Sequence, residues 1–478
     1  MSRPKLLIIV LFQNLGEEYP YYARSPAPPL AGALVAGLTP PIVDIELLHE
    51  MVRPINYDTD ADFVALSFMD YCAPHAFEVA RKFHERGKIV VAGGKYPSTF
   101  PDAVVPHFDA TVVGEAEQIW PQVVEDMVNG RLKRVYRAPF APPLDNIPPP
   151  RYDLVESVFP VVMVTETSRG CVHRCSFCQL TVENAPYRVR PVKDVIRDLT
   201  AIKTLPYHKR KLAMLLDNNF GGDIEHAKEV LREVAKLKMW AIGIQFSFDC
   251  LHDKEYVDLL VKAHCHMAFI GLESLNEPSL AAIHKRHNHV DEYQELFQML
   301  RRRRILTFTG MMLAIDEDTP EYYENLPGNL ARVSPSSILM SIAIPIPGTP
   351  LNKKVVADGR LTDTNLANYD GDHLVFKPKS VTANDVFRAY KRINRLFFSI
   401  PSIVRRWWKF ITAYSGEENI ALQVFNSVLI SIFFFELNYF ERDHANRRVY
   451  ANESLSAGKS EEEPLLDKKE TPLIQSSR

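Results

Sequence analysis

The sequence predicts an α/β protein made of two successive parallel sheets and a mainly helical C-terminal module. Two series of short apolar runs alternate with helix-compatible stretches, and a proline-dense segment separates the two series. This alternation favours parallel sheets, because neighbouring parallel strands need a long crossover that is usually a helix. A length of 478 residues is enough for two or three domains.

The first series fills residues 1–138 and predicts a doubly wound sheet, which binds its ligands beyond the carboxyl ends of the strands. The expected elements are strands Lys5–Phe12, Val43–Leu48, Asp62–Phe68, Lys88–Ala92 and Ala110–Val113 and helices Pro29–Gly37 and His75–Arg86. Gly93, Gly94 and Gly114 follow two of these strands. Because glycine lacks a Cβ, the backbone there could approach a bulky ligand closely. The alternative is that all three are ordinary turn glycines.

A proline-dense linker is predicted over residues 139–158. Its densest parts are Pro139–Pro143 and Ile147–Pro150. Proline has no backbone N–H and disrupts helices and inner strands, so we expect an extended connection. The domain boundary is placed here.

The second series, residues 159–350, predicts a partial TIM-like (β/α)6 barrel that is open on one side. The expected strands are Val161–Thr165, Leu212–Leu216, Ala241–Phe246, Met267–Leu272, Leu306–Leu313 and Ile338–Ile344. Helix-compatible stretches such as Val192–Lys203 and Ile224–Lys236 lie between them. Barrels of this kind carry their chemistry at the carboxyl ends of the strands.

Residues 351–450 are expected to form a mainly helical accessory module. Val386–Ser399 and Ile403–Tyr414 have amphipathic spacing, and the second stretch carries cations beside Trp407 and Trp408. Such a helix could touch a membrane surface, although packing against the barrel mouth is the commoner use.

Composition and hydropathy argue against membrane spans and nucleic-acid binding. The run Leu6–Phe12 is too short to cross a bilayer, and polar residues interrupt Ile420–Phe440, which we expect to be a buried or interfacial helix. A net charge of -3 gives no electrostatic reason for nucleic-acid binding. Residues 451–478 are polar and are expected to be disordered.

Half of the six cysteines lie within eight residues, at Cys171, Cys175 and Cys178, in the spacing C-x3-C-x2-C. A 4Fe-4S cluster is normally held by four thiolates, so these three would leave one iron without a protein ligand. A zinc site needs four closed ligands, and here it would require His173 or a distant side chain. Three unrelated thiols are the remaining alternative. Six cysteines make no disulfide framework in a chain of this length, and an oxygen-sensitive cluster needs a reducing compartment, so we expect a cytoplasmic protein.

Polar residues gather where the expected barrel strands end. The candidates for cofactor binding at these ends are Asp217, Asn218, Gln245, Ser247, Gly271 and Glu273. Asp316–Thr319 follows a further strand and could be only a solvated N-cap of the next helix. Each residue alone could belong to a turn or a cap, but their recurrence at one edge favours a site.

The run Arg169–Cys178 resembles the signature of the radical SAM superfamily, with Phe177 as the aromatic residue before the last cysteine. The resemblance implies a 4Fe-4S cluster on the three cysteines, with S-adenosylmethionine (SAM) bound to the open iron and cleaved reductively. Asp217 and Asn218 lie near the family's motif for the methionyl amine. Gly271–Ser274 resembles a recurrent segment whose glutamate accepts from the ribose hydroxyls.

A second resemblance involves the N-terminal domain. Val91–Pro97 and Val112–Glu117 resemble the cobalamin-binding domain that precedes many radical SAM domains. On this resemblance, the candidate cobalamin contacts are Gly93, Gly94, Gly114 and Glu115. The chain lacks the D-x-H-x-x-G segment whose histidine ligates cobalt in mutase-type domains, as do many cobalamin-type radical SAM proteins. Tyr369–Pro378 resembles the accessory region of a subgroup that includes hopanoid methylases.

Together the resemblances imply a cobalamin-dependent radical SAM methylase that acts on an unactivated carbon of a small organic molecule, such as a lipid or isoprenoid. An electron donor such as flavodoxin or ferredoxin is expected as a partner. A cobalamin-type radical SAM cyclase or oxidoreductase without methyl transfer is the alternative, and a non-catalytic zinc-binding module is a second one.

Overall fold

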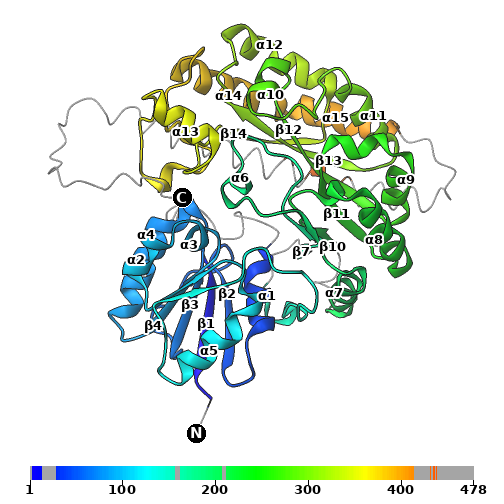
Figure 1. Cartoon of the computed structure of the whole chain (residues 1–478). Coiled ribbons are helices and arrows are strands. Elements are labelled where there is room, and N and C mark those ends of the chain that lie inside the picture. The colour runs from blue at the N-terminus through cyan, green and yellow to red at the C-terminus, as the bar shows by residue number, and fades with distance from the viewer. Residues whose placement is uncertain are drawn as a thin grey trace.

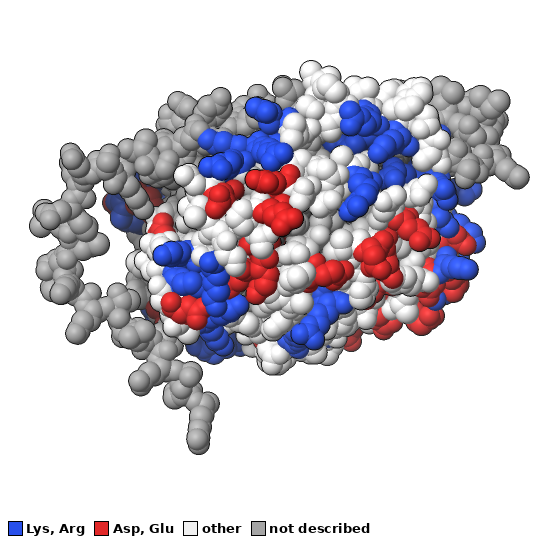
Figure 2. All heavy atoms as spheres, turned by 90° about the horizontal axis from the view of Figure 1, so that it is seen from above, with Lys and Arg blue, Asp and Glu red and all other residues white. Residues whose placement is uncertain are grey.

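The computed structural model describes residues 3–12, 28–156, 162–206 and 212–413, together with Ser431, Phe434, Phe435 and Asn438. The expected disordered tail and most of Ile420–Phe440 lie outside these residues. Among the described helices, none is both long and apolar enough to span a bilayer. Basic and acidic side chains are interspersed over the face seen from above in Figure 2.

The N-terminal domain is a six-stranded parallel sheet in the order β2-β1-β3-β4-β5-β6. Its strands are β1 (Lys5–Val10), β2 (Asp44–His49), β3 (Phe63–Ser67), β4 (Ile89–Gly93), β5 (Ala110–Val113) and β6 (Val135–Arg137). The chain order reverses between β1 and β3, which is where doubly wound sheets open a crevice for a ligand. The sequence prediction lacked β6, because its three residues are too few for a recognisable pattern.

Helices cover both faces of this sheet (Figure 1). On one face, α1 (Leu30–Leu38) and α5 (Trp120–Val128) pack against the side chains of Leu6 and Ile8. On the other face, α2 (Ala73–His84) packs against Leu7 and Ile9, and the short helices α3 (Lys95–Thr99) and α4 (Pro101–Val104) follow β4. The strands are therefore buried on both sides, which explains their nearly unbroken apolar runs.

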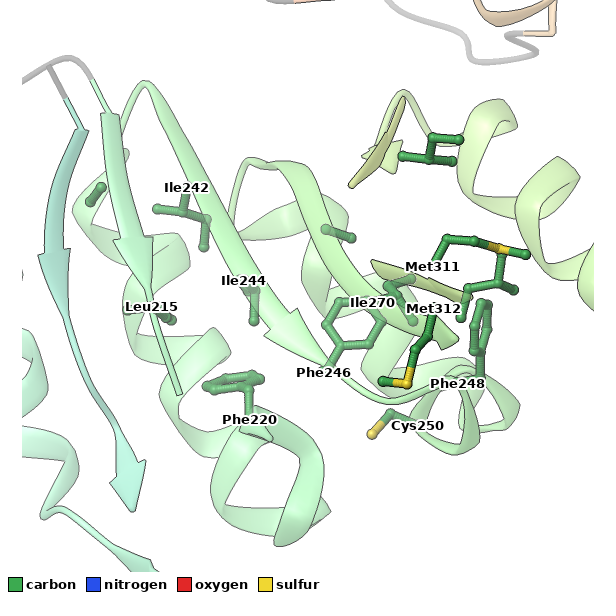
Figure 3. Packing of buried hydrophobic residues seen from close by; sticks show 14 of the residues in the cluster. Leu215, Phe220, Ile242, Ile244, Phe246, Phe248, Cys250, Ile270, Met311 and Met312 are labelled. Atoms are coloured by element: carbon green, nitrogen blue, oxygen red, sulfur yellow. The ribbon is translucent and has the colours of Figure 1, made fainter. Parts of the chain in front are cut away.

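The second domain is a six-stranded parallel sheet in the order β14-β13-β12-β11-β10-β7. Its strands are β7 (Val162–Thr165), β10 (Leu212–Leu215), β11 (Ala241–Phe246), β12 (Cys265–Glu273), β13 (Leu306–Leu313) and β14 (Ser337–Ile342). The connecting helices are α7 (Val192–Thr204), α8 (Ile224–Leu237), α9 (Lys254–Lys262), α10 (Glu277–Ala282), α11 (Tyr293–Arg302) and α12 (Pro320–Val333). Figure 3 shows the apolar strand side chains, such as Ile242 and Ile244, packed beside these helices. The predicted α/β fold class, with a doubly wound sheet followed by an open (β/α)6 barrel, is confirmed.

The proline-rich connection has no helix or strand from Ala138 to Arg151 apart from turns and bends. It packs on α1: the backbone N–H of Arg151 donates to the carbonyl of Ala33 at 2.9 Å. The carbonyl oxygen of Pro149 approaches Gly37 so closely that a Cβ there would lie 2.4 Å from it. Glycine at this position lets the connection lie flat against the N-terminal domain.

The C-terminal module contains α13 (Pro350–Ala357), α14 (Ala383–Phe397) and α15 (Ile400–Thr412). The loop between α13 and α14 joins the two domains. The backbone N–H of Ile342, at the end of β14, donates to the carbonyl of Gly371 at 2.6 Å, and Leu366 packs into the apolar cluster around α2. The module therefore contacts both domains on the open side of the barrel.

Candidate active site

The three cysteines lie in the loop that follows β7, at the carboxyl end of the barrel strands. β7 ends at Thr165, and a two-residue strand, β8 (Ser168–Arg169), leads to Gly170. Gly170 has φ +89, and a Cβ there would meet the carbonyl oxygen of Pro186 at 2.8 Å, so the turn requires glycine. This turn sends the chain into Cys171.

The three thiols lie close enough to affect one another's pKa values. The pKa of the Cys175 thiol is raised to about 11, mainly by burial, with smaller contributions from negative charge on Cys178 and Cys171. Burial is also the main cause of the raised pKa of Cys178, with Cys171 contributing. The thiols therefore lie near enough to affect one another, as the ligands of one centre must.

Lys285 is a buried cation beside these thiols, and the sequence analysis did not select it. It lowers the pKa of Cys171, Cys175 and Cys178, in each case against the larger effect of burial. Its Nζ lies 2.9 Å from Oε1 of Glu273. Burial opposes the charge on Lys285, but the Glu273 carboxylate and the neighbouring thiols outweigh it and raise the pKa of Lys285.

Glu273 stands at an irregularity at the end of β12. The register between β12 and β13 shifts between Gly271 and Glu273, and Glu273 has φ +61. A Cβ on Gly271 would lie 2.5 Å from both Glu273 Oε1 and Lys285 Nζ. Glycine is therefore required at residue 271 to admit this ion pair, which is a packing reason for one of the predicted site residues.

The Asp217 carboxylate is hydrogen-bonded to Thr167 and Ser168, which precede the cysteine loop. Its carboxylate accepts from the backbone N–H groups of Thr167 and Ser168, each at 2.6 Å, and from the Thr167 hydroxyl at 3.0 Å. Burial raises the pKa of Asp217 to about 7, although these hydrogen bonds lower it. The structure thus gives Asp217 a positioning contact with the start of the cysteine loop, and its predicted role in cofactor binding stays a prediction. Asn218 is exposed.

Asn219, which was not among the selected residues, faces the cysteine loop from the same turn. Its Oδ1 accepts from the backbone N–H and the hydroxyl of Ser247, both at 3.2 Å. Its buried Nδ2 has no hydrogen-bond partner among the described residues, and the side chain helps to lower the pKa of Cys171. Ser247 is buried, whereas Gln245 on β11 is half-buried.

His173 is directed away from a zinc-like arrangement. Its Nε2 lies 3.3 Å from Ser247 Oγ and 3.5 Å from Asp249 Oδ2, and its ring stacks on His287 at 3.5 Å. Across the described part of the chain, no group of three or more His, Cys, Asp or Glu side chains is arranged to hold a single metal ion. The His173 ring therefore has partners other than the three thiols, and the preference for a cluster over zinc rests on the cysteine spacing. Phe177 is half-buried and packs on the main apolar core.

The three selected glycines of the N-terminal domain line one groove at the carboxyl ends of β3, β4 and β5. Small residues, including Gly32 and Ala116, form about half of the remaining lining, and larger apolar side chains form the other half. Gly94 and Gly114 have φ +101 and +94, so both turns favour glycine whatever the groove holds. Gly93 differs, because a Cβ there would meet nothing closer than Val112 Cβ at 3.9 Å.

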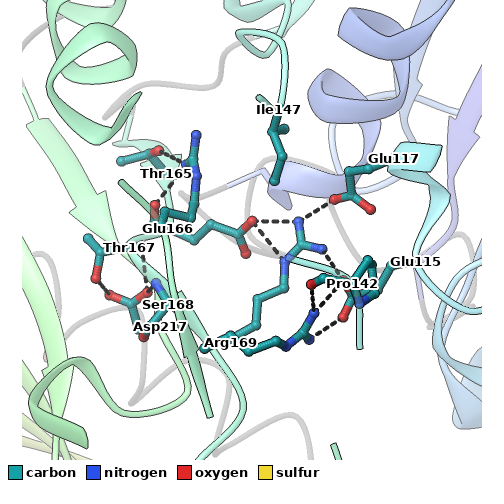
Figure 4. Close-up of polar contacts among 12 residues, drawn as sticks. Glu115, Glu117, Pro142, Ile147, Thr165, Glu166, Thr167, Ser168, Arg169 and Asp217 are labelled. Carbon is teal, nitrogen blue, oxygen red and sulfur yellow. Dashed lines mark hydrogen bonds and ion pairs between the residues drawn. The ribbon is translucent and has the colours of Figure 1, made fainter. Parts of the chain in front are cut away.

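Glu115 lies in an ion-pair group between the two domains (Figure 4). Arg169 contacts Glu115 at 2.9 Å, Glu166 and Glu117, and Arg188 donates to Glu115 at 3.0 Å. Burial opposes the charge on Glu115, but the two arginines hold its pKa below the ordinary value. The Glu115 carboxylate therefore pairs with two arginines of the barrel domain, whereas the resemblance predicted that Glu115 contacts cobalamin.

The acidic stretch after β13 corrects one sequence interpretation. Asp316 is buried and pairs with both Arg360 and Lys354. Asp318 is fully buried and accepts from the Tyr323 hydroxyl at 3.0 Å. The prediction of a solvated cap is therefore wrong for Asp316 and Asp318, because both carboxylates are buried and have side-chain partners. Only Thr319 caps α12.

Comparison with known proteins agrees with this arrangement. Residues 165–326 match the model of the radical SAM superfamily. The chain is 29% identical to bacteriochlorophyllide d C-8(2)-methyltransferase of Chlorobaculum tepidum over 363 residues, which cover 73% of this chain and 80% of that protein. It is 24% identical to hopanoid C-2 methylase of Rhodopseudomonas palustris, over 72% of this chain and 67% of that protein.

Several solved structures match nearly the whole chain, with 95% of it covered. One of them is the radical S-adenosylmethionine methyltransferase TsrM from Kitasatospora setae, with cobalamin and a [4Fe-4S] cluster bound. The TM-score is 0.59 at 17% sequence identity, with 95% of this chain and 100% of that chain covered. At this identity the match shows a shared fold.

Residues 165–326 are therefore a radical SAM domain, as the resemblance of the cysteine run predicted. The protein is an enzyme with this domain, and its relatives include methyltransferases.

The raised pKa of Asp217 predicts a specific pH dependence of stability. Between the ordinary aspartate pKa and about 7, the folded state holds the Asp217 proton and the unfolded chain does not, so this residue makes stability fall as pH rises through that window. Asp217→Asn removes this effect. We therefore expect the free energy of unfolding of the original protein, minus that of Asp217→Asn, to decrease as the pH rises from 5 to about 7, by up to about 1.4 kcal/mol per pH unit.

Urea unfolding of the metal-free protein at several pH values measures this difference. Asp223→Asn, which changes an exposed aspartate at the start of α8, is the matched control. A difference between the original protein and Asp217→Asn that stays constant with pH would contradict the assignment.

Proposed function

We propose that the chain is a cobalamin-dependent radical SAM methyltransferase. The observation that carries the proposal is the three-thiol loop at the carboxyl end of β7 within a radical SAM domain. When bound, a 4Fe-4S cluster supplies the electron that cleaves SAM, and cobalamin supplies the means of methyl transfer. The chain's own residues bind these groups, orient them and exclude water.

Cys171, Cys175 and Cys178 hold the cluster in this proposal. Thiolates ligate such clusters, and the chain offers three that share one electrostatic neighbourhood. Lys285 offsets part of their negative charge, because a buried cation stabilises nearby anions strongly where water is excluded. Asp217 fixes the start of the loop through Thr167 and Ser168.

SAM binds beside this loop. Asn219 directs its buried Nδ2 toward the Cys171 thiol, whose pKa it lowers, and Ser247 fixes the amide through Oδ1. The Oε2 atom of Glu273 has no hydrogen-bond partner among the residues described, so it is available to ribose hydroxyls while Oε1 holds Lys285. Gln245, Gly271 and Phe177 complete the wall of this site.

Cobalamin binds over the glycine groove of the N-terminal sheet. Small residues line the groove at the point where the strand order reverses, and TsrM, which shares this fold, was solved with cobalamin bound. Gly93 is the most informative lining residue, because its Cβ direction is open. Glu115 stabilises the edge of the groove through Arg169 and Arg188 and has no contact role with the corrin in this proposal.

The substrate is a hydrophobic small molecule. Two methylating relatives are named for a bacteriochlorophyllide and for a hopanoid, which are both largely apolar. The electron donor is a flavodoxin or ferredoxin, and the reaction takes place in the reducing cytoplasm, because an exposed cluster is sensitive to oxygen.

Gly93→Leu tests the cobalamin site. The leucine side chain would enter the groove without a backbone clash, so we expect cobalamin affinity to fall at least about tenfold while the fold persists. Titration of the protein with cobalamin, followed by corrin absorption after gel filtration, measures this affinity. Gly328→Leu on α12 is the control, because a Cβ there meets nothing within 4 Å. Equal cobalamin binding by both variants would place the corrin elsewhere.

Methyl transfer itself is tested with the anaerobically reconstituted protein, cobalamin, a reductant and methyl-tritiated SAM, in the presence of a lipid extract. We expect 5'-deoxyadenosine together with tritium in an extractable product, and neither from Cys175→Ala, which lacks one proposed cluster ligand. Deoxyadenosine without tritium in any product would reject the methyltransferase and favour a cyclase or oxidoreductase.

A further inference from the structure

Helix α15 has an exposed face that the other described residues leave uncovered. Ile400, Val404 and Trp408 are 65%, 44% and 60% exposed, and their four-residue spacing places them in one row along the helix. Arg405 and Lys409 are exposed in the neighbouring row, one residue further along. The exposed surface of α15 thus carries an apolar row beside a basic row, and we call it the α15 face.

The opposite side of α15 is firmly packed, so the α15 face is not an apolar surface that could turn inward. Ile403 and Phe410 are buried in a cluster with Leu306 of the barrel. The Arg406 guanidinium is buried 3.6 Å above the Phe397 ring, and burial lowers its pKa to about 9. The helix is held in its present orientation by these contacts.

The exposed charge of α14 and α15 is mainly basic. The exposed basic residues of α14 and α15 are Arg388, Arg392, Arg395, Arg405 and Lys409. Asp385 is the acidic residue of these two helices, and its carboxylate is hydrogen-bonded to Thr382 in the capping box of α14. The chain as a whole has a net charge of -3, so this concentration of cations is a local departure from its average.

We propose that the α15 face docks on the surface of an anionic lipid bilayer. The apolar row would enter the headgroup region, where tryptophan is favoured, and the basic row would meet lipid phosphates. A second copy of this chain is a poor occupant, because a self-complementary contact would bring like charges together. This inference is independent of the proposed chemistry, since it concerns only where the protein binds.

The test is co-sedimentation of the full-length protein with vesicles of phosphatidylcholine alone and of equal parts phosphatidylcholine and phosphatidylglycerol. We expect binding to the anionic vesicles that weakens with added salt. Arg405→Glu/Lys409→Glu should lower the partition coefficient at least about tenfold, because each cation near an anionic surface contributes to binding. Lys254→Glu/Lys262→Glu on the exposed side of α9 is the matched charge control and should bind normally.

The apolar row is tested with Trp408→Ser against Trp240→Ser, since Trp240 is also exposed, at 46%, but lies just before β11. Only Trp408→Ser should reduce binding. In the unaltered protein, phosphatidylglycerol brominated in its acyl chains should quench tryptophan fluorescence, which needs no variant. Equal binding to both kinds of vesicle, equal losses in the control variants, or a dimer abolished by Trp408→Ser without vesicle binding would each overturn the proposal.

Discussion

The ion-pair group around Arg169 is the contact on which the proposed site depends. Arg169 stands two residues before Cys171, and its guanidinium joins Glu166 of its own domain to Glu115 and Glu117 of the N-terminal domain. Glu115 directly follows Gly114, which lines the glycine groove. One side chain therefore sets the position of the cysteine loop relative to the groove. Removing one partner of such a partly buried group leaves an uncompensated charge, which typically costs about 3–5 kcal/mol, so the two domains are strongly biased toward this arrangement.

A second constraint follows from bringing three thiols together away from water. Burial alone raises the pKa of each thiol and so opposes the thiolate form that binds iron. Lys285 acts in the opposite direction on all three. Glu273 in turn keeps Lys285 charged, and Gly271 provides the space for their contact. The irregular end of β12 is thus explained by the electrostatic needs of the neighbouring cysteine loop.

Much of the fold could be predicted from the sequence, because its strands are buried on both faces and read as plain apolar runs. The cysteine loop could be predicted for a different reason, since the spacing of Cys171, Cys175 and Cys178 is itself the chemical signal. Lys285 could not, because it lies twelve residues after Glu273 in a loop and nothing local marks it as a partner. The ion pairs of Glu115 could not be predicted for the same reason: beside a strand-end glycine it resembles a ligand contact, and only the folded chain shows that Arg169 and Arg188 reach it. Asp217 was found as a residue of the site, but its partners, two backbone N–H groups, have no sequence signal.

The central claim is that three cysteines hold a cluster whose remaining iron is open to SAM. The most direct measurement is electron paramagnetic resonance of the anaerobically reconstituted and reduced protein, recorded with and without SAM. The account predicts the signal of a reduced 4Fe-4S cluster whose g-values shift when SAM is added, because SAM becomes a ligand of the open iron. A cluster signal that SAM leaves unchanged, or a protein that binds one zinc ion and no iron, would contradict it.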